Sequence, residues 1–143
     1  MNEEGTWQII ALENANDGKL VYRMMFEKPT KIDCGQFTEN VSVTWHFADE
    51  GLPSSEIGEV LRMFEGLVDS LDDSDGNSLL TFVFSGRGMR EWSYYAKDYK
   101  KFMEMLNDAL ASKPRFPIEI EHTHDPEWGY WSGVKAHVTE ASG

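Results

Sequence analysis

Hydrophobic and polar residues alternate most strictly over residues 40–47, where every second side chain is apolar. Successive side chains of a β-strand point to opposite faces of a sheet, so Val41, Val43, Trp45 and Phe47 share one face. We expect a strand here, with this face toward the core and the other face polar.

Five further segments rich in β-branched and aromatic residues also predict strands: 5–12, 19–27, 79–85, 89–95 and 115–122. A turn-forming run, residues 14–18, separates the first two segments, and Gly86-Arg87-Gly88 separates the third from the fourth. Each of these pairs is therefore expected to form a β-hairpin.

Between residues 53 and 71 the period changes to that of an amphipathic helix, with apolar residues at i, i+3, i+4 and i+7 and acids between them. Ser54 or Ser55 is placed to cap the start of this helix. The charged, turn-forming residues 72–77 are expected to end it.

A second helix is predicted over residues 99–110, where Asp98 is placed to cap the start and Pro114 to stop the helix. From residue 40 onward the expected order is therefore strand, helix, strand, strand, helix, strand. This is the order of ferredoxin-like split βαβ domains. Each helix has a single apolar stripe, so both should cover one face of a mainly antiparallel sheet.

The length of 143 residues is that of one domain with one core. We predict a single α+β domain, a ferredoxin-like sandwich with an extra N-terminal hairpin. Residues 1–38 would form the hairpin and its connection, residues 39–131 the ferredoxin-like core, and residues 132–143 a C-terminal tail.

The composition restricts the environment and the partners. The 25 acids outnumber the 13 Lys and Arg residues, and a net charge of −12 disfavours binding to nucleic-acid phosphates. No stretch has the length of a membrane span, and the acidic N-terminus lacks the pattern of a secretory signal. Cys34 is the single cysteine, which fits a reducing compartment. We expect a cytoplasmic protein that binds neither nucleic acid nor a membrane.

The negative charge is concentrated between residues 49 and 75, where nine acids stand against Arg62 alone. On a helix face and the turn after it, these acids would produce a field that steers a basic partner. The candidate partner-binding residues are Glu65, Asp69, Asp72, Asp73 and Asp75. The alternative is a charged surface that only keeps the protein in solution.

The segment His122-Thr123-His124-Asp125 places two imidazoles and a carboxylate near the end of a predicted strand. Such groups are ligands for zinc or a similar ion. His122 also continues the apolar face of Ile118 and Ile120, and this favours a partly buried position at the sheet edge over a metal site. No nucleophile motif or phosphate-binding loop is present, and no cofactor is expected.

The second half of the chain carries an ordered set of motif residues: Gly86, Arg90, Trp92, Tyr95, Asp125, Pro126 and Trp128. Over about residues 79–131 this combination resembles DUF695, a bacterial family of unknown function. The resemblance implies a ferredoxin-like bacterial domain without an established activity, and it transfers no catalytic residue. In architecture and acidity the chain is also similar to the regulator of ribonuclease activity B, an acidic protein that inhibits an enzyme by binding it.

The sequence therefore favours a non-catalytic protein-interaction or regulatory domain that acts through its acidic helix face on a partner with a basic surface. The alternative is a small-molecule-binding protein or metal-assisted enzyme that uses the corner from His122 to Glu127.

Overall fold

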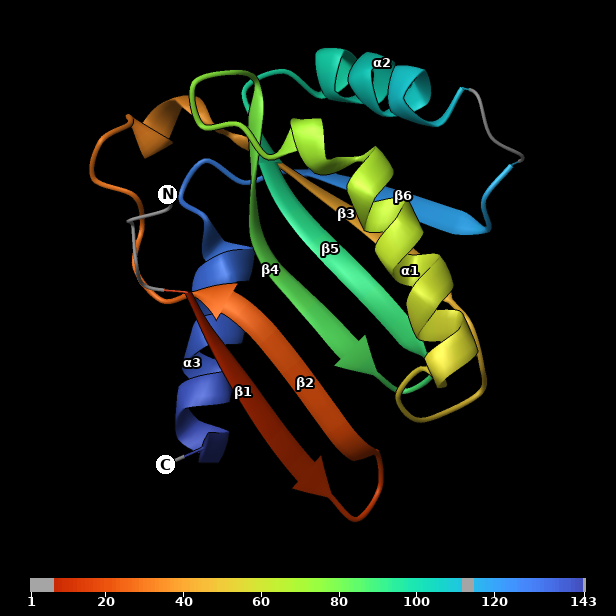
Figure 1. Ribbon diagram of the computed structural model, residues 1–143. Helices are drawn as coiled ribbons and strands as arrows, with labels where there is room; N and C mark the ends of the chain where they lie inside the picture. Colours follow the sequence, from red (N-terminus) through yellow and green to blue (C-terminus); the bar gives the residue numbers. More distant parts are fainter. Residues whose placement is uncertain (1–6, 112–114, 143) are drawn as a thin grey trace.

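The described residues, 7–111 and 115–142 of the computed structural model, contain one sheet of six antiparallel strands (Figure 1). The strands are β1 (Trp7–Asn14), β2 (Gly18–Met25), β3 (Glu39–His46), β4 (Ser78–Gly86), β5 (Met89–Ala96) and β6 (Ile118–His124). They lie in the order β1-β2-β4-β5-β3-β6. Both predicted hairpins are confirmed, and the first extends the sheet because β2 pairs with β4.

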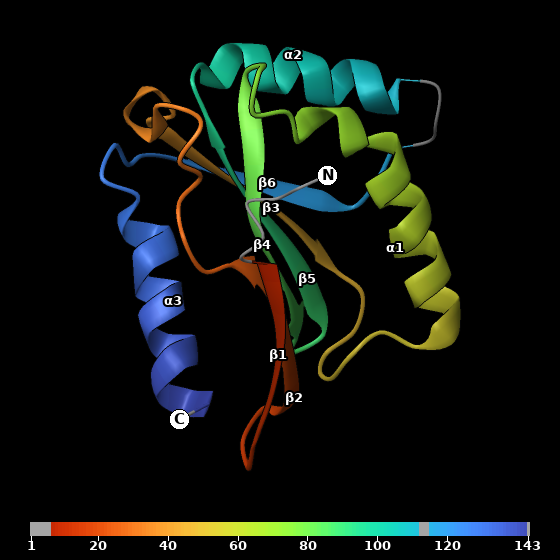
Figure 2. The ribbon, with the colours of Figure 1, turned by 60° about the vertical axis from the view of Figure 1, so that its left-hand side comes forward.

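Three helices pack against the sheet, and they lie on both of its faces (Figure 2). They are α1 (Ser55–Leu67) and α2 (Tyr99–Leu110) on one face and α3 (Gly129–Ser142) on the other. Short 3-10 helices cover Cys34–Gln36 and Asp69–Leu71. None of the helices in the described part of the chain is long and apolar enough to cross a membrane.

The third helix corrects the prediction of two helices followed by a tail. α3 begins where the Asp125 carboxylate accepts hydrogen bonds from the backbone N–H groups of Gly129 (2.8 Å) and Tyr130 (3.0 Å). Its two buried side chains, Trp131 and Val138, are spaced i, i+7 and share one face. With so few buried residues the apolar stripe is narrow, and the helical period is weak in the sequence.

The first core lies between the sheet and the helices α1 and α2. Val41, Val43 and Trp45 of β3 are buried in it, as the alternating pattern predicted. Phe64 of α1 packs against Trp45 and Trp92, with ring centroids 5.4 and 5.0 Å apart. Burial of these aromatic rings anchors α1 to the sheet.

The second core lies under α3, on the opposite face. Tyr22 of β2 and Phe84 of β4 are in contact there, with ring centroids 4.9 Å apart. Trp131 of α3 is buried against them, and its indole N–H donates a hydrogen bond of 3.0 Å to the Met25 carbonyl. The C-terminal helix is therefore an integral part of the domain.

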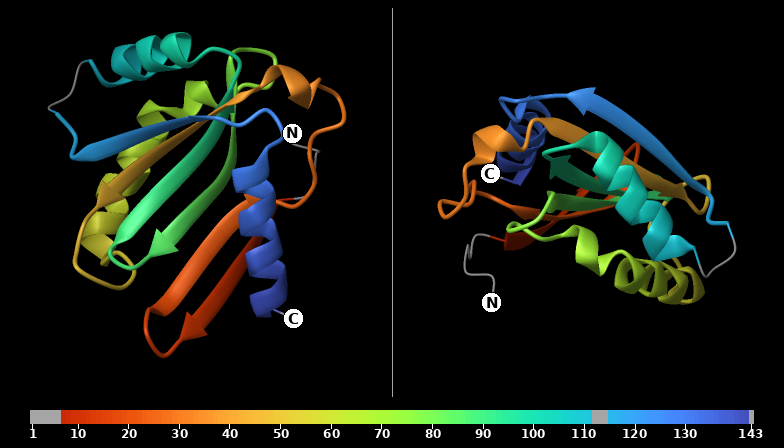
Figure 3. Two further views of the ribbon diagram at one scale, coloured as in Figure 1. Left: turned by 180° about the vertical axis from the view of Figure 1, so that it is seen from behind. Right: turned by 90° about the horizontal axis from the view of Figure 1, so that it is seen from above.

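The helices cover opposite halves of the two faces (Figure 3). The core under α1 and α2 contains residues of β3, β4, β5 and β6, and the core under α3 contains residues of β1, β2, β4 and β5. On the α3 side, the half of the sheet formed by β3 and β6 has no helix over it. This open half is polar, because Asn40 and Ser42 of β3 and Glu121 of β6 face it.

Both predicted N-caps are confirmed, and Ser54, not Ser55, caps α1. The Ser54 hydroxyl accepts a hydrogen bond of 3.2 Å from the Ile57 N–H, and Asp98 accepts one of 3.2 Å from the Lys101 N–H. Pro114, which was expected to stop α2, lies outside the described residues.

If α3 is part of the core, Trp131→Ala should reduce the free energy of unfolding by about 3–5 kcal/mol, the usual cost of removing a buried Trp side chain. Thr139→Ala, an exposed position on the same helix, is the matched control and should change it by less than about 0.5 kcal/mol. Urea unfolding of both variants measures the difference. Equal midpoints would contradict the assignment.

Candidate functional site

The acidic residues predicted to bind a partner fall into different environments. Glu65 of α1 faces the sheet and accepts hydrogen bonds from the Arg90 guanidinium (3.3 Å) and the Trp92 indole N–H (2.9 Å). The guanidinium of Arg23 lies 4.0 Å from the same carboxylate oxygen. Glu65 is therefore hydrogen-bonded within the protein, to two of the motif residues.

Asp69, Asp72, Asp73 and Asp75 follow α1 in the connection to β4. Asp72 accepts a hydrogen bond of 2.9 Å from the Leu80 N–H, and partial desolvation raises the pKa of its carboxyl above the ordinary value, with Asp69 and Asp73 adding to the effect. Asp73 accepts a hydrogen bond of 3.0 Å from the Asp75 N–H and so shapes the turn. These contacts give Asp72 and Asp73 structural roles.

A pocket of about 280 Å³ lies between this acidic connection and the sheet. Glu65, Asp69 and Asp72 line it together with Arg23. The structure thereby brings together three of the five predicted partner-binding residues, while Asp73 and Asp75 lie in the turn beyond. Arg23 and Arg90 neutralise much of the charge at this position.

The outer side of α1 is different. Val60 and Met63 are exposed there, at 40% and 44% of their accessible surface, and Glu56 and Glu59 are exposed beside them. Residues three and four apart are neighbours on a helix surface, so these four side chains form one continuous patch. We call it the α1 patch. The apolar stripe that predicted the helix counted Val60 as a core residue, and the structure places it outside.

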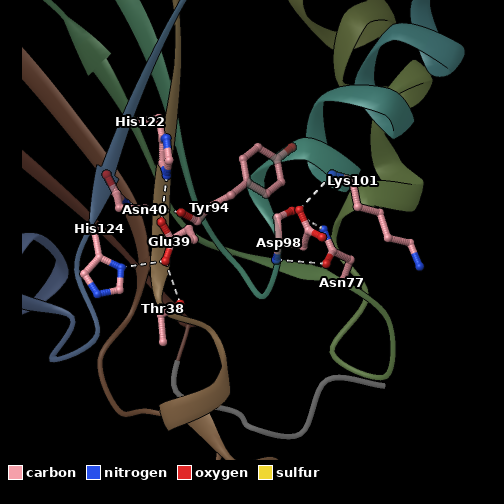
Figure 4. Close-up of polar contacts among 9 residues, drawn as sticks. All are labelled: Thr38, Glu39, Asn40, Asn77, Tyr94, Asp98, Lys101, His122 and His124. Carbon is pink, nitrogen blue, oxygen red and sulfur yellow. Dashed lines mark hydrogen bonds and ion pairs between the residues drawn. The ribbon is translucent and has the colours of Figure 1, made fainter.

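Figure 4 shows the corner at which the two predicted histidines lie. His122 and His124 of β6 both point to Glu39, the first residue of β3: His122 Nε2 lies 2.7 Å from one carboxylate oxygen and His124 Nδ1 lies 2.7 Å from the other. The Thr38 hydroxyl donates a third hydrogen bond, of 2.7 Å. Sequence reasoning missed Glu39, because only the pairing of β3 with β6 brings it opposite His124.

These contacts change the acidity of Glu39. Burial opposes its ionisation, but the hydrogen bonds from Thr38, His122 and His124 outweigh burial and lower the pKa of Glu39 to about 2. Each imidazole bonds a different carboxylate oxygen. In the described part of the chain, no group of three or more His, Cys, Asp and Glu side chains is arranged to hold a metal ion.

The cap of α2 positions an aromatic side chain on this corner. Asp98 is held by Asn77, whose side chain donates to the Asp98 carbonyl (3.0 Å) and accepts from the Asp98 N–H (3.2 Å). The next residue, Tyr99, stacks on the His122 ring with centroids 3.9 Å apart and planes 6° from parallel. His122 is therefore fixed on two sides, by Glu39 and by Tyr99.

Asp125, the third member of the predicted metal set, has other partners. Besides capping α3, its carboxylate accepts a hydrogen bond of 2.6 Å from the Tyr95 hydroxyl. Burial opposes ionisation of Asp125, but these hydrogen bonds prevail and lower the pKa of its carboxyl. Its carboxylate joins the sheet to α3, and Glu127 of the same corner is exposed.

Trp128 completes this junction. It is fully buried, stacks on Tyr95 with centroids 4.4 Å apart, and donates its indole N–H to the Phe37 carbonyl at 2.9 Å. Its backbone has a φ of 59°, which is uncommon for a residue with a side chain. Pro126 precedes it in the tight turn that the Trp128 N–H closes by donating to the Asp125 carbonyl at 3.1 Å.

A comparison with models of protein families gives a match over most of the chain. The model of DUF695, described as a family of unknown function, matches residues 6–133. The chain belongs to this family. No curated protein matches it, and the similarity to the regulator of ribonuclease activity B is not shown by these comparisons.

The DUF695 match covers all six strands, α1, α2 and the start of α3. The motif residues used for the resemblance form two clusters within this span. Arg90 and Trp92 hold Glu65 of α1, and Tyr95, Asp125 and Trp128 attach α3. At Gly86, a Cβ atom would lie 2.6 Å from a Leu20 methyl group, so glycine permits the close approach of β2. These contacts of the motif residues therefore stabilise the fold.

Glu65→Ala should reduce the free energy of unfolding by about 2–3 kcal/mol, because it leaves the Arg90 guanidinium without its anion and the Trp92 N–H without its acceptor. Glu59→Ala, an exposed change on the same helix, should alter it by less than about 0.5 kcal/mol. Urea unfolding at neutral pH measures both. Similar small effects would mean that Glu65 has no structural role.

Because the pKa of Glu39 in the folded protein, about 2, lies below its ordinary value of 4.5, ionised Glu39 stabilises the fold. This contribution is complete above about pH 4.5 and is lost as the pH falls through about 2. Glu39→Gln should therefore cost more stability at pH 6 than at pH 3, measured by urea unfolding.

Carbon-13 NMR of the Glu39 carboxyl group is the direct check, and it should report ionisation persisting at pH values where exposed glutamates are already protonated. A titration midpoint near 4.5 would refute the assignment.

Proposed function

We propose that this DUF695 protein is a non-catalytic protein-interaction or regulatory domain that binds a basic segment of another protein through the α1 patch. The observation that carries the proposal is the exposure of Val60 and Met63 between Glu56 and Glu59 on the outer side of α1. Leu61 and Phe64 already anchor the inner side of the helix, so the exposed pair is not needed for the core.

The chemistry of the patch defines the partner. Exposed apolar side chains at the centre of an interface exclude water, and charged side chains at the rim steer the encounter and set the register. Val60 and Met63 suit apolar residues of a partner, and Glu56 and Glu59 suit Lys or Arg residues beside them. An amphipathic helix with a basic border is the segment that fits these requirements.

Several features of the domain support this function. A ferredoxin-like arrangement of β3 to β6 with α1 and α2 is part of the proposal, and it would hold α1 rigidly on the sheet. The acids of the connection, Asp69 and Asp75, extend the negative field beyond the α1 patch. A location in the cytoplasm is part of the proposal, since Cys34 is a free thiol.

The test is affinity capture of host proteins on the full chain, with quantification of each retained protein. Glu56→Gln with Glu59→Gln should lower retention of the specific partner by roughly tenfold, as expected for loss of two charges at an interface. The matched control, Glu104→Gln with Asp108→Asn, removes the same charge from exposed positions of α2.

Retention that falls equally in both double variants would indicate general attraction of basic proteins. Retention that persists in the α1 variant would refute the proposal. Val60→Ser with Met63→Ser gives an independent reading at unchanged charge and should also weaken capture.

The alternative function is small-molecule binding at the corner from His122 to Glu127. One observation favours it: a polar groove on the sheet adjoins His124 and Asp125.

A further inference from the structure

Figure 3 shows that β3 and β6 lie beside α3 without a helix over them on the face that carries α3. The groove is lined by residues of these two strands and by Tyr130 of α3. Its volume is about 390 Å³. The floor is formed by Asn40 and Ser42 of β3, which stand opposite Thr123 and Glu121 of β6 in the strand register. Tyr130 of α3 lines it as well and is 41% exposed. The groove is on the sheet face opposite the α1 patch.

Of the hydrogen-bond donors of the groove, those of Asn40, Ser42 and Tyr130 are already used within the protein. The hydroxyl groups of Ser42 and Tyr130 both donate to one oxygen of Glu91, at 2.8 and 2.7 Å. The Asn40 side-chain amide donates to the Ser93 hydroxyl (3.0 Å) and to the Tyr94 carbonyl (3.2 Å) of β5. A ligand of this groove therefore meets few free N–H or O–H groups.

The acceptors, in contrast, are left open. Asn40 is only 5% exposed, yet its side-chain oxygen accepts no hydrogen bond from the described residues. Because its amide nitrogen points to β5, the oxygen points the other way, toward β6 and the groove. A buried acceptor without a partner is costly, and a donor from a ligand would satisfy it.

The carboxylates of Glu121 and Asp125 line the groove together with the imidazole of His124. Within residues 7–111 and 115–142, neither Glu91 nor Glu121 forms an ion pair with Lys or Arg, and no Lys or Arg lines the groove. Burial raises the pKa of the Tyr130 hydroxyl, and Glu91 and Glu121 add to this effect. Tyr130 therefore stays protonated and donates its hydrogen bond to Glu91. The carboxylates of Glu91 and Glu121 repel anionic ligands.

We propose that this groove binds a guanidinium group. A guanidinium carries N–H donors and no acceptor, so it complements a site in which the donors of Asn40, Ser42 and Tyr130 are occupied and the acceptors of Asn40 and Glu121 face the ligand. Its plane can stack on an exposed aromatic ring such as Tyr130, while its edge donates to Glu121 and the Asn40 oxygen. The group can come from a free arginine derivative or from an arginine side chain of a peptide.

Nuclear magnetic resonance titration of the nitrogen-15-labelled full chain tests the proposal. The probes are N-acetyl-arginine amide, the corresponding citrulline compound, which is neutral and of similar shape, and the peptide Gly-Arg-Gly. The arginine probes should shift the side-chain amide signals of Asn40 and the backbone signals of Ser42, Glu121 and Thr123. The citrulline compound should leave them unchanged. Tighter binding of the peptide identifies a protein source, and tighter binding of the amide a small molecule.

Glu121→Gln should raise the Kd for N-acetyl-arginine amide by roughly tenfold. The matched control is Glu119→Gln, the same change two residues away on the same face of β6, where the carboxylate lies 3.9 Å from His46 and outside the groove. Its Kd should stay within about twofold of the unaltered protein.

Equal shifts with the arginine and citrulline probes, or an unchanged Kd in the Glu121 variant, would overturn the proposal. The Glu56→Gln, Glu59→Gln variant should keep full arginine binding, so a failure of this site and a failure of the α1 patch are distinguishable.

Discussion

Burial of β4 on both of its faces is the constraint on which the rest of the structure depends. Eight of its nine residues are buried. Phe82 and Phe84 belong to the core beneath α3, whereas Val83 belongs to the core beneath α1 and α2. A strand covered on both sides reads as a continuous apolar run and joins the two cores into one unit. The neighbouring strand β5 is buried in the same way from Trp92 to Ala96, with Tyr94 in the core beneath α1 and α2 and Tyr95 in the core beneath α3.

The acidic residues of the chain serve two different purposes, and the net charge alone does not distinguish them. Glu39, Glu65 and Asp125 each lie where two elements meet, and each accepts hydrogen bonds from side chains of another element. These carboxylates connect β3 to β6, α1 to β5, and β5 to α3. Burial opposes ionisation of Glu39 and Asp125, but their hydrogen bonds lower the pKa of both. Acids such as Glu56 and Glu121 lie at the surface and give the negative field outside the molecule.

The two proposed binding surfaces follow from the same arrangement. The α1 patch lies on the outer side of a helix whose inner side is buried, and the groove lies on the half of the sheet that α3 leaves open. Both are negative, and both suit cationic groups of a ligand. Among the motif residues of this DUF695 domain, Asp125 lines the groove, and its carboxylate also holds α3 to the sheet. Binding specificity would then reside mainly in residues outside the motif.

The sequence by itself determined the local structure. The alternation around Val43 placed β3, and Ser54 and Asp98 marked the helix starts, because hydrophobic period and capping act between residues close in the chain. α3 was not predicted, since its stability comes from Trp131 and Val138 in a core built by distant strands and from the Asp125 cap.

The tertiary structure alone decided which polar side chains meet. Glu39 precedes His122 and His124 by more than eighty residues, and only the register of β3 with β6 joins them. In the same way, the contacts of Glu65 with Arg90 and Trp92 depend on strand order, and so does the unpaired side-chain oxygen of Asn40. The hydrophobic periodicity of the sequence does not encode strand order. Local patterns specify the elements, and the burial of their apolar faces determines how side chains from distant elements are combined.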